Sequence, residues 1–309
     1  MRDETLEVRG RSEVSQSSHR NLVVVRAGDA SLHPGWGAGE ASCGFDLIVS
    51  YFGDDPAAYR APCENRCDQK GGKWDGIHAL FAQRPDLLRL YDYVWFPDDD
   101  IEADRATIEG IFAAMRRFDL AIAQPALTVD SYYSHFPLLR SRSFELRFVD
   151  TVEIMVPCLR IEILASMMPL LKTTMSGFGL DPIWTRLGTD NLRKSAVFDA
   201  LPVRHTRPLG NSLAVEMRRY GRTPNDEFRE LQQRYGFGVL YPICYEAIGR
   251  NDRRWRSPAA IGLRMALDYL SARTSMRQTH RFERTLWRLI WRQSSRTAQL
   301  SPLTIATPG

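Results

Sequence analysis

A short apolar run that ends in three consecutive carboxylates constrains the fold of this chain more than any other stretch. Residues 91–96 are rich in aromatic and β-branched side chains, which is typical of a buried strand. Pro97 cannot donate a hydrogen bond to a sheet, so we expect the strand to end there. The acids at 98–100 follow directly, and Asp104 is suited to cap the next helix. Acids at the carboxyl end of a strand lie where open α/β sheets bind their ligands.

Three adjacent carboxylates repel one another unless a cation offsets their charge. Hard divalent cations such as Mg²⁺ and Mn²⁺ take oxygen ligands and bind through a few carboxylates and substrate phosphates. In an extended chain the side chains of Asp98 and Asp100 point to one side and that of Asp99 to the other. We therefore expect Asp98 and Asp100 to bind the metal. The alternative is a solvated turn, in which Asp is common.

The charge of the chain is unevenly distributed. The 309 residues carry a formal net charge of +4, which is too small to indicate a nucleic-acid partner for the whole chain. Residues 250–296, however, contain twelve Arg, no Lys and three acids, for a net charge of +9. Trp287 and Trp291 lie in the same segment, so its helices could lie on an anionic membrane surface. The alternative is a solvated helix packed on the domain.

The five cysteines are an odd number, which favours reduced thiols in a cytosolic protein over disulfides. Cys63 and Cys67 could begin a zinc site, but no second pair follows at the spacing of a zinc finger. Residues 1–20 are polar and resemble neither a signal peptide nor a membrane span. We expect a soluble, cytoplasmic protein whose residues 1–20 are disordered.

Strand-like and helix-like stretches alternate through the first two thirds of the chain. The expected strands are residues 21–26, 45–52, 91–96, 120–126 and 152–156, and the expected helices are 74–88, 105–118 and 157–172. This alternation favours an α/β sheet with several parallel strands and flanking helices. Beyond residue 210 the pattern becomes helical. We therefore divide the chain into a disordered segment (1–20), an α/β domain (21–209) and a helical, Arg-rich C-terminal extension (210–309).

A second stretch, residues 176–187, places Asp181 between two glycines and a proline. Such a sequence fixes a turn and could begin a helix, with Pro182 at its first position. Asp181 could therefore be a catalytic base or only a helix cap. His205 lies in a polar segment among arginines and could be a metal ligand or a surface residue. Glu153 lies between apolar neighbours, so it would be an outward-pointing strand residue or a buried acid near the acceptor.

The acidic strand, the Gly-rich turn and the late histidine follow one another in an order that resembles a GT-A type glycosyltransferase. The runs YDYVWFPDDDIEAD and SGFGLDPIW are more particularly similar to an uncharacterised family found in bacteria and plants. Its plant members carry the label "lysine-ketoglutarate reductase trans-splicing related". The resemblance covers residues 20–208 and implies a GT-A-like fold, with a mixed, mostly parallel sheet flanked by helices. The acceptor region has no recognisable pattern.

The resemblance also implies a role for each matched residue. Asp98 and Asp100 would hold Mn²⁺ or Mg²⁺ and, through it, the diphosphate of a nucleoside diphosphate sugar. His205 would complete the metal site, and Asp181 would be the general base of an inverting enzyme. Contacts to the nucleotide are expected, by location alone, from Arg26, Asp54, Lys73 and Asp99.

These expectations describe a metal-dependent glycosyltransferase that moves a sugar from a nucleoside diphosphate sugar to a hydroxyl acceptor. The acceptor would be a glycan or a lipid-linked precursor, as in the synthesis of a cell-surface polysaccharide. The same acidic site could instead serve a nucleotidyl- or phosphotransferase, or could have become a non-catalytic sugar-binding site. Peripheral contact of the Arg-rich helices with the inner face of a membrane is a further expectation, and a nucleic-acid partner is not expected.

Overall fold

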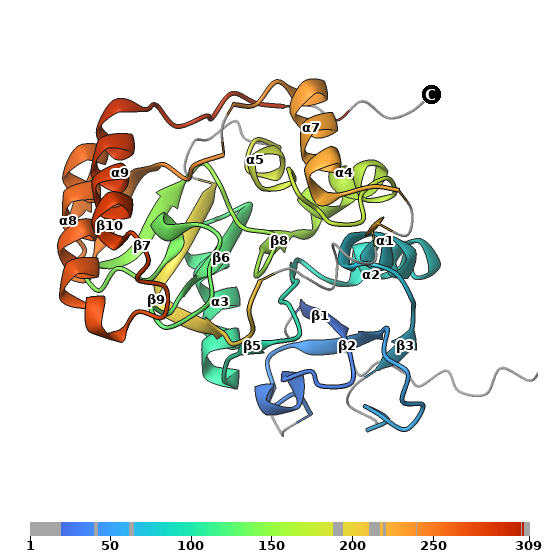
Figure 1. Ribbon diagram of the computed structural model, residues 1–309. Helices are drawn as coiled ribbons and strands as arrows, with labels where there is room; N and C mark the ends of the chain where they lie inside the picture. The colour runs from blue at the N-terminus through green and yellow to red at the C-terminus, as the bar shows by residue number, and fades with distance from the viewer. Residues whose placement is uncertain are drawn as a thin grey trace, which may run out of the picture.

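The computed structural model describes residues 20–39, 43–61, 65–187, 194–209, 217–218, 221–238, 240–303 and 305. These residues form one large mixed sheet with the strand order β11-β10-β7-β9-β6-β8-β4-β1-β2-β3, and helices flank it (Figure 1). The predicted mixed α/β class is confirmed. Residues 1–19, for which disorder was expected, lie outside the described residues. So do Cys63 of the cysteine pair and most of residues 210–220, where the helical pattern begins.

The N-terminal side of the sheet is parallel. β1 (Asn21–Ala27) lies between β2 (Asp46–Tyr51) and β4 (Tyr93–Trp95), and β3 (Arg66–Asp68) lies beyond β2. Every residue of β1 is buried, as expected of a parallel strand that is covered on both faces. Because these strands run the same way, their carboxyl ends meet at one edge of the sheet.

The rest of the sheet is mainly antiparallel. β8 (Cys158–Arg160) is antiparallel to both β4 and β6 (Ile122–Leu127), so it joins the two sides. β9 (Ser195–His205) is parallel to β6 but antiparallel to β7 (Phe144–Val149). A mixed, mostly parallel sheet was expected. The parallel pairs lie mainly among the N-terminal strands, and β6 with β9 is a further parallel pair.

The C-terminal third supplies strands as well as helices. β10 (Cys244–Gly249) pairs antiparallel with β7, and β11 (Arg254–Trp255) pairs with β10. The helical pattern beyond residue 210 did not indicate these strands. α8 (Pro258–Ser271) and α9 (Phe282–Ser295) then pack against each other at the left of Figure 1. No helix within the described ranges is both long and apolar enough to cross a membrane.

The other helices agree broadly with the periodicity of the sequence. They are α1 (Lys73–Gln83), α2 (Leu87–Leu90), α3 (Arg105–Arg117), α4 (Ile161–Leu171), α5 (Asp181–Trp184) and α7 (Pro224–Tyr235), with short 3-10 turns η1 (His33–Trp36), η3 (Phe136–Leu138) and η4 (Arg273–Ser275). The Asp104 side chain accepts a hydrogen bond from the Thr107 amide at 2.7 Å, which confirms the predicted helix cap.

The strand predicted at residues 152–156 is wrong. This segment is irregular, β8 begins only at Cys158, and α4 begins at Ile161. The amide of Glu153 donates to the side chain of Gln124 at 2.7 Å, and the amide of Ile154 donates to Asp181 at 3.0 Å. Side chains from distant segments thus take the hydrogen bonds that a neighbouring strand would have taken.

A fully buried ion pair joins two strands in the middle of the sheet. Arg147 on β7 donates to both carboxylate oxygens of Asp199 on β9, at 2.7 and 2.8 Å. The guanidinium also donates to the carbonyls of Pro137 and Leu139, and the carboxylate accepts from the Ser141 amide at 2.7 Å. Each charge is therefore matched by its opposite and by several hydrogen bonds.

Candidate functional site

The acidic residues that follow β4 meet a histidine from the end of β9. The amide of Asp98 donates to the carbonyl of Met155 at 2.9 Å, and Asp98 also forms a β-bridge with Arg26 of β1. The two-residue strand β5 (Ile101–Glu102) pairs antiparallel with β9, which sets Ile101 opposite His205. This short pairing brings the histidine beside the acids although it lies far away in sequence.

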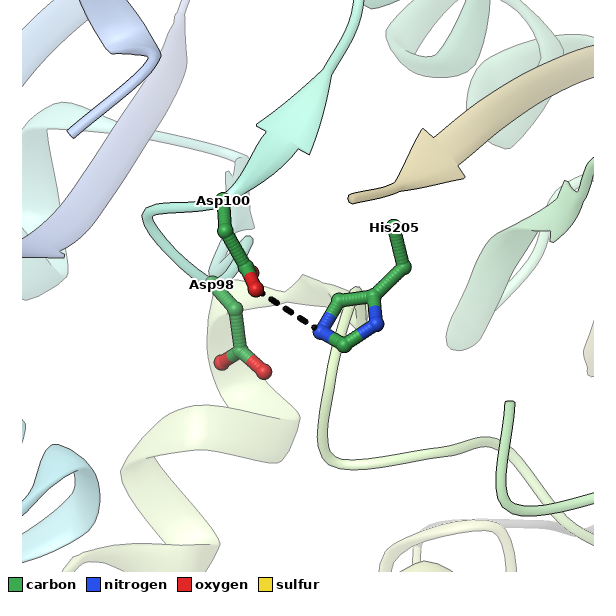
Figure 2. A group of neighbouring side chains, drawn as sticks. All are labelled: Asp98, Asp100 and His205. Carbon is green, nitrogen blue, oxygen red and sulfur yellow. Dashed lines mark ion pairs between the residues drawn. The ribbon is translucent and has the colours of Figure 1, made fainter. Parts of the chain in front are cut away.

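Asp98, Asp100 and His205 form a compact group. One possible ligand atom from each lies within 4.8 Å of the others, and the His205 Nε2 lies 3.2 Å from Asp100 Oδ2 (Figure 2). Asp100 and His205 are buried, and Asp98 is half-buried. The structure thus brings the three predicted metal ligands together.

The contacts of His205 show which of its two ring nitrogens carries a proton. Nδ1 lies 3.1 Å from the carbonyl oxygen of Tyr132, and since a carbonyl can only accept, Nδ1 carries the proton. Nε2 faces the Asp100 carboxylate, so a proton or a cation must lie between these two acceptors. Burial lowers the pKa of His205, but the hydrogen bond and charge of Asp100 outweigh it and hold the pKa above its usual value.

Lys73 neutralises Asp98 from the other side. Its ammonium lies 2.6 Å from Asp98 Oδ1 and also donates to the carbonyls of Phe96 and Ile154, at 2.8 and 2.7 Å. Burial lowers the pKa of Lys73 although the Asp98 charge opposes that shift. Because its N–H groups are already directed at these acceptors, Lys73 affects the site by holding Asp98 in place.

Asp99 is not part of this group and has partners of its own. The Ile101 amide donates to the Asp98 carbonyl at 3.3 Å, so residues 98–101 form a turn and not the extended chain on which the prediction rested. Asp99 accepts from the Gly28 amide at 2.8 Å and from Arg207 at 3.3 Å. Burial raises the pKa of Asp99 although both donors favour the charged form. Asp99 therefore links the end of β4 to the loop after β1 and to the segment after β9.

Asp181 lies on the fixed turn that its neighbours predicted. Gly177 and Gly179 have φ angles of 77° and 100°, a region that favours glycine, and Pro182 lies at the start of α5. A Cβ on Gly177 would lie 2.2 Å from Trp74, so only glycine fits there. Burial raises the pKa of Asp181 to about 7, with the Ile154 amide among the donors that oppose the shift.

Glu153 is a buried acid beside Asp181. Only 1% of it is exposed, and neither carboxylate oxygen has a hydrogen-bond partner in the described part of the chain. Burial, together with the charge of Asp181, raises its pKa well above the usual value. Its position between apolar neighbours was the signal for burial in the sequence. Both acids line a cavity of about 270 Å³.

Two predicted nucleotide contacts lie apart from this group. The Arg26 guanidinium donates to Ser50 Oγ and to the carbonyls of Gln69 and Gly71, at 2.8, 2.8 and 2.9 Å. Asp54 is exposed and pairs with Lys70 at 2.7 Å. Arg26 therefore holds the loop before α1, while Asp54 lies on a surface beside it.

No family model matches the chain, and no curated protein matches it. Similar solved structures include a protein from Desulfovibrio desulfuricans whose proposed identity is a nucleotide-diphospho-sugar transferase, with a TM-score of 0.30, 12% identity, and coverage of 47% of this chain and 64% of that one. A fragment of S. aureus TarS in complex with UDP-GlcNAc has a TM-score of 0.41 and 11% identity, covering 89% and 72%. The same TarS fragment in another crystal structure has a TM-score of 0.33 and 14% identity, covering 47% and 48%. These scores assign neither a family nor an activity to this chain.

Proposed function

We propose that this protein is a metal-dependent glycosyltransferase that moves a sugar from a nucleoside diphosphate sugar to a hydroxyl acceptor. One observation carries the proposal: Asp98, Asp100 and His205 lie together at the end of β4, and hydrogen bonds connect this group to Asp181. Lys73 contacts both Asp98 and the Ile154 carbonyl, and the Ile154 amide donates to Asp181. The carboxylates of the proposed metal group and the carboxylate of Asp181 thus lie close together but have different hydrogen-bond partners.

The first group fits a divalent cation. Two carboxylates and an imidazole are ligands that Mn²⁺ accepts, and Mg²⁺ accepts the oxygens. A histidine that donates its other N–H to a backbone carbonyl, as His205 does to Tyr132, is typical of metal ligands. A cation would also relieve the contact of Nε2 with Asp100. Bound there, the ion would offset the negative charge of the leaving diphosphate.

The second group fits a general base. In the reaction, the acceptor hydroxyl gives its proton to Asp181, and its oxygen forms a bond to the anomeric carbon of the donor sugar. The bond from that carbon to the diphosphate breaks, and its electron pair leaves with the nucleoside diphosphate. A carboxylate with a pKa of about 7 is well matched to this proton transfer near neutral pH.

The donor would lie between the metal group and the loop after β1. Gly28 is fixed there by Asp99, and Arg207 lies on the other side of the same carboxylate. Arg26 and Asp54 remain candidates for nucleotide contact by their location, Arg26 through the loop that it holds. Lys73 would keep Asp98 ionised and oriented.

We also propose that α8 and α9 rest on an anionic membrane, where a lipid-linked precursor of a cell-surface glycan would be the acceptor. Leu263, Leu267 and Leu270 lie exposed on one face of α8, and Trp287 and Trp291 are 69% and 59% exposed on α9.

The two helices pack against each other in opposite directions. Gly262 contacts Gln293 near one end of the pair and Arg273 binds Glu283 near the other, so the helices are antiparallel. Each helix thus carries an exposed apolar row of its own. Exposed Arg284 and Arg288 lie next to the tryptophans, a pattern that suits anionic lipid headgroups.

Vesicle sedimentation tests the membrane proposal. The protein should sediment with vesicles that contain phosphatidylglycerol and not with pure phosphatidylcholine vesicles. Trp287→Ser/Trp291→Ser should abolish the sedimentation, and a matched Leu90→Ser change at another exposed apolar residue should leave it unchanged. Equal sedimentation of the tryptophan variant would exclude this surface.

Calorimetry tests the proposed reaction. The protein is titrated with a panel of nucleoside diphosphate sugars, with and without Mn²⁺, and with nucleoside triphosphates beside them. We expect at least one nucleotide sugar to bind only when Mn²⁺ is present. This Mn²⁺-dependent binding should be lost in Asp100→Asn. Preference for a triphosphate would indicate a nucleotidyl- or phosphotransferase instead, and binding without turnover would indicate a sugar-binding protein.

A further inference from the structure

Glu153 has a buried carboxyl group that the protein satisfies poorly. The His135 amide opposes the rise of its pKa, but neither oxygen makes a hydrogen bond of normal geometry to a described residue. The amide of Glu153 itself is held by Gln124 at 2.7 Å. Buried polar groups are almost always hydrogen-bonded, because an unpaired one costs a few kcal/mol. Asp181, by comparison, accepts from the Ile154 amide. The free oxygens of Glu153 therefore suit hydrogen-bond donors that come from a ligand.

The cavity beside Glu153 has a definite chemistry. Its polar lining consists of the two acids with Ser134, His135 and Asn225, and no Lys or Arg belongs to the described residues that line it. Burial lowers the pKa of His135 to about 4, so this ring is neutral at pH 7. In the lining itself an anionic ligand would meet two carboxyl groups and no positive charge, which favours a neutral occupant over a phosphate or a carboxylate.

The remaining walls of the cavity are apolar and partly aromatic. Phe178 is 41% exposed, Phe228 lines the same space, and Ile154, Met155 and Leu240 complete it. A sugar ring has hydroxyl donors around its edge and C–H groups on its faces. The hydroxyl groups at the edge could donate hydrogen bonds to the two acids, and the C–H faces could pack against the phenyl rings. At about 270 Å³, the cavity is at the lower end of the size of ligand sites.

We propose that this cavity binds the acceptor of the reaction, that the acceptor is a neutral sugar ring, and that Glu153 binds two of its hydroxyl groups. Glu153 is then an acceptor-binding residue, and it directs a third hydroxyl toward Asp181. The proposal rests on the proposed function for the role of the ligand. The binding site itself rests only on the cavity and its lining.

Binding of simple methyl glycosides tests this proposal. Methyl glucoside, galactoside and mannoside are titrated into the full-length protein without metal or nucleotide, and binding is followed by saturation-transfer NMR. We expect at least one glycoside to bind, and its affinity to fall at least tenfold in Glu153→Leu. Asp100→Asn should bind it like the unmodified protein, because the metal group lies outside the cavity.

A second variant keeps the test decisive if Glu153→Leu does not fold. Phe178→Ala changes a partly exposed side chain, and it should also strongly lower the affinity for the glycoside. The absence of binding by any glycoside, or unchanged binding by both variants, would overturn the proposal. Preferential binding of hexylamine would also overturn it and would identify a site for an organic cation.

The titrations separate this proposal from the proposed function. If a nucleotide sugar binds with Mn²⁺ but no glycoside binds, the acceptor site is wrong and the transferase is retained. If a glycoside binds through Glu153 but no nucleotide sugar does, the cavity is a sugar site and the transferase is wrong.

Discussion

Two buried groups of charged side chains in this protein are built in opposite ways. In the sheet, Arg147 and Asp199 match one positive charge with one negative charge, and backbone groups take the remaining hydrogen bonds. At the end of β4, five carboxyl groups lie close together: Asp98, Asp99, Asp100, Glu153 and Asp181. Lys73, Arg207 and His205 contact the first three, so acids outnumber bases in this group. A complete pair holds two strands together, whereas an incomplete group retains the capacity to bind something else.

The comparison separates stability from function. A matched pair contributes to the fold and offers nothing to a ligand. An excess of buried acid lowers the stability of the free protein, and a protein retains such a group where it serves a function. Substitutions in the two groups should therefore have opposite consequences.

The largest effect is expected on the reaction rate at Asp181. Asp181→Asn removes the proposed base and should slow sugar transfer by about 10²–10⁴-fold, or about 3–5 kcal/mol in the barrier. Stability should be unchanged or higher, because a buried acid with a raised pKa is removed. Transfer assays and urea unfolding measure the two quantities.

The pH dependence of the same step provides the control. Because the base must be unprotonated, kcat/KM should rise with pH through about 7. An undiminished rate in Asp181→Asn, or a kcat/KM of the unmodified protein that is flat between pH 6 and 8, would remove the base assignment.

The next effect is on stability at the matched pair. Arg147→Met leaves Asp199 buried without a counter-charge and should lower the free energy of unfolding by about 3–5 kcal/mol. Arg204→Met is the control, because Arg204 pairs with Glu102 and Asp130 at the surface and should cost less than about 1 kcal/mol. Similar losses in both variants would show that burial does not distinguish the pairs.

Asp150 is an intermediate case that sharpens the comparison. It accepts from the amides of Ile243 and Gln299, it forms no ion pair with any of the described residues, and burial raises its pKa to about 6 from 3.8. Its contribution to stability is full below about pH 4 and is lost as pH rises through 6, which amounts to about 3 kcal/mol. Urea unfolding from pH 4 to 7 should show this slope reduced in Asp150→Asn. Parallel curves for the two proteins would contradict it.

The smallest effect is expected when both members of the matched pair are replaced. Arg147→Met/Asp199→Val removes both charges, so the large loss of the single variant should not appear. The Ser141 amide loses its acceptor, which leaves a cost of about 1–3 kcal/mol. A double variant as unstable as Arg147→Met alone would show that the packing of the arginine, and not its charge, stabilises the sheet.

Local features of the site could be predicted from the sequence. The strand before Pro97 and the turn before Asp181 depend on neighbouring residues alone. Gly177 and Gly179 adopt the positive φ angles that such a turn requires. Short-range geometry therefore carried these predictions.

The remaining features depend on contacts between distant segments. His205 reaches Asp100 because β5 pairs with β9, and the resemblance, not the periodicity, indicated this. The strand predicted around Glu153 does not form, because the amides of Glu153 and Ile154 donate to the side chains of Gln124 and Asp181. Lys73 was expected beside the nucleotide, and its contact with Asp98 could not be read from its position in the chain.

The pairing of β10 with β7 has a practical consequence for anyone who shortens this protein. A fragment that stops near residue 209 would keep the acidic residues and His205, yet it would leave β7 with one side unpaired. Phe144, Leu146 and Phe148 lie along that strand, so the bare edge would invite intermolecular sheet formation and insoluble material. Residues 20–209 and the C-terminal region are best expressed as one piece.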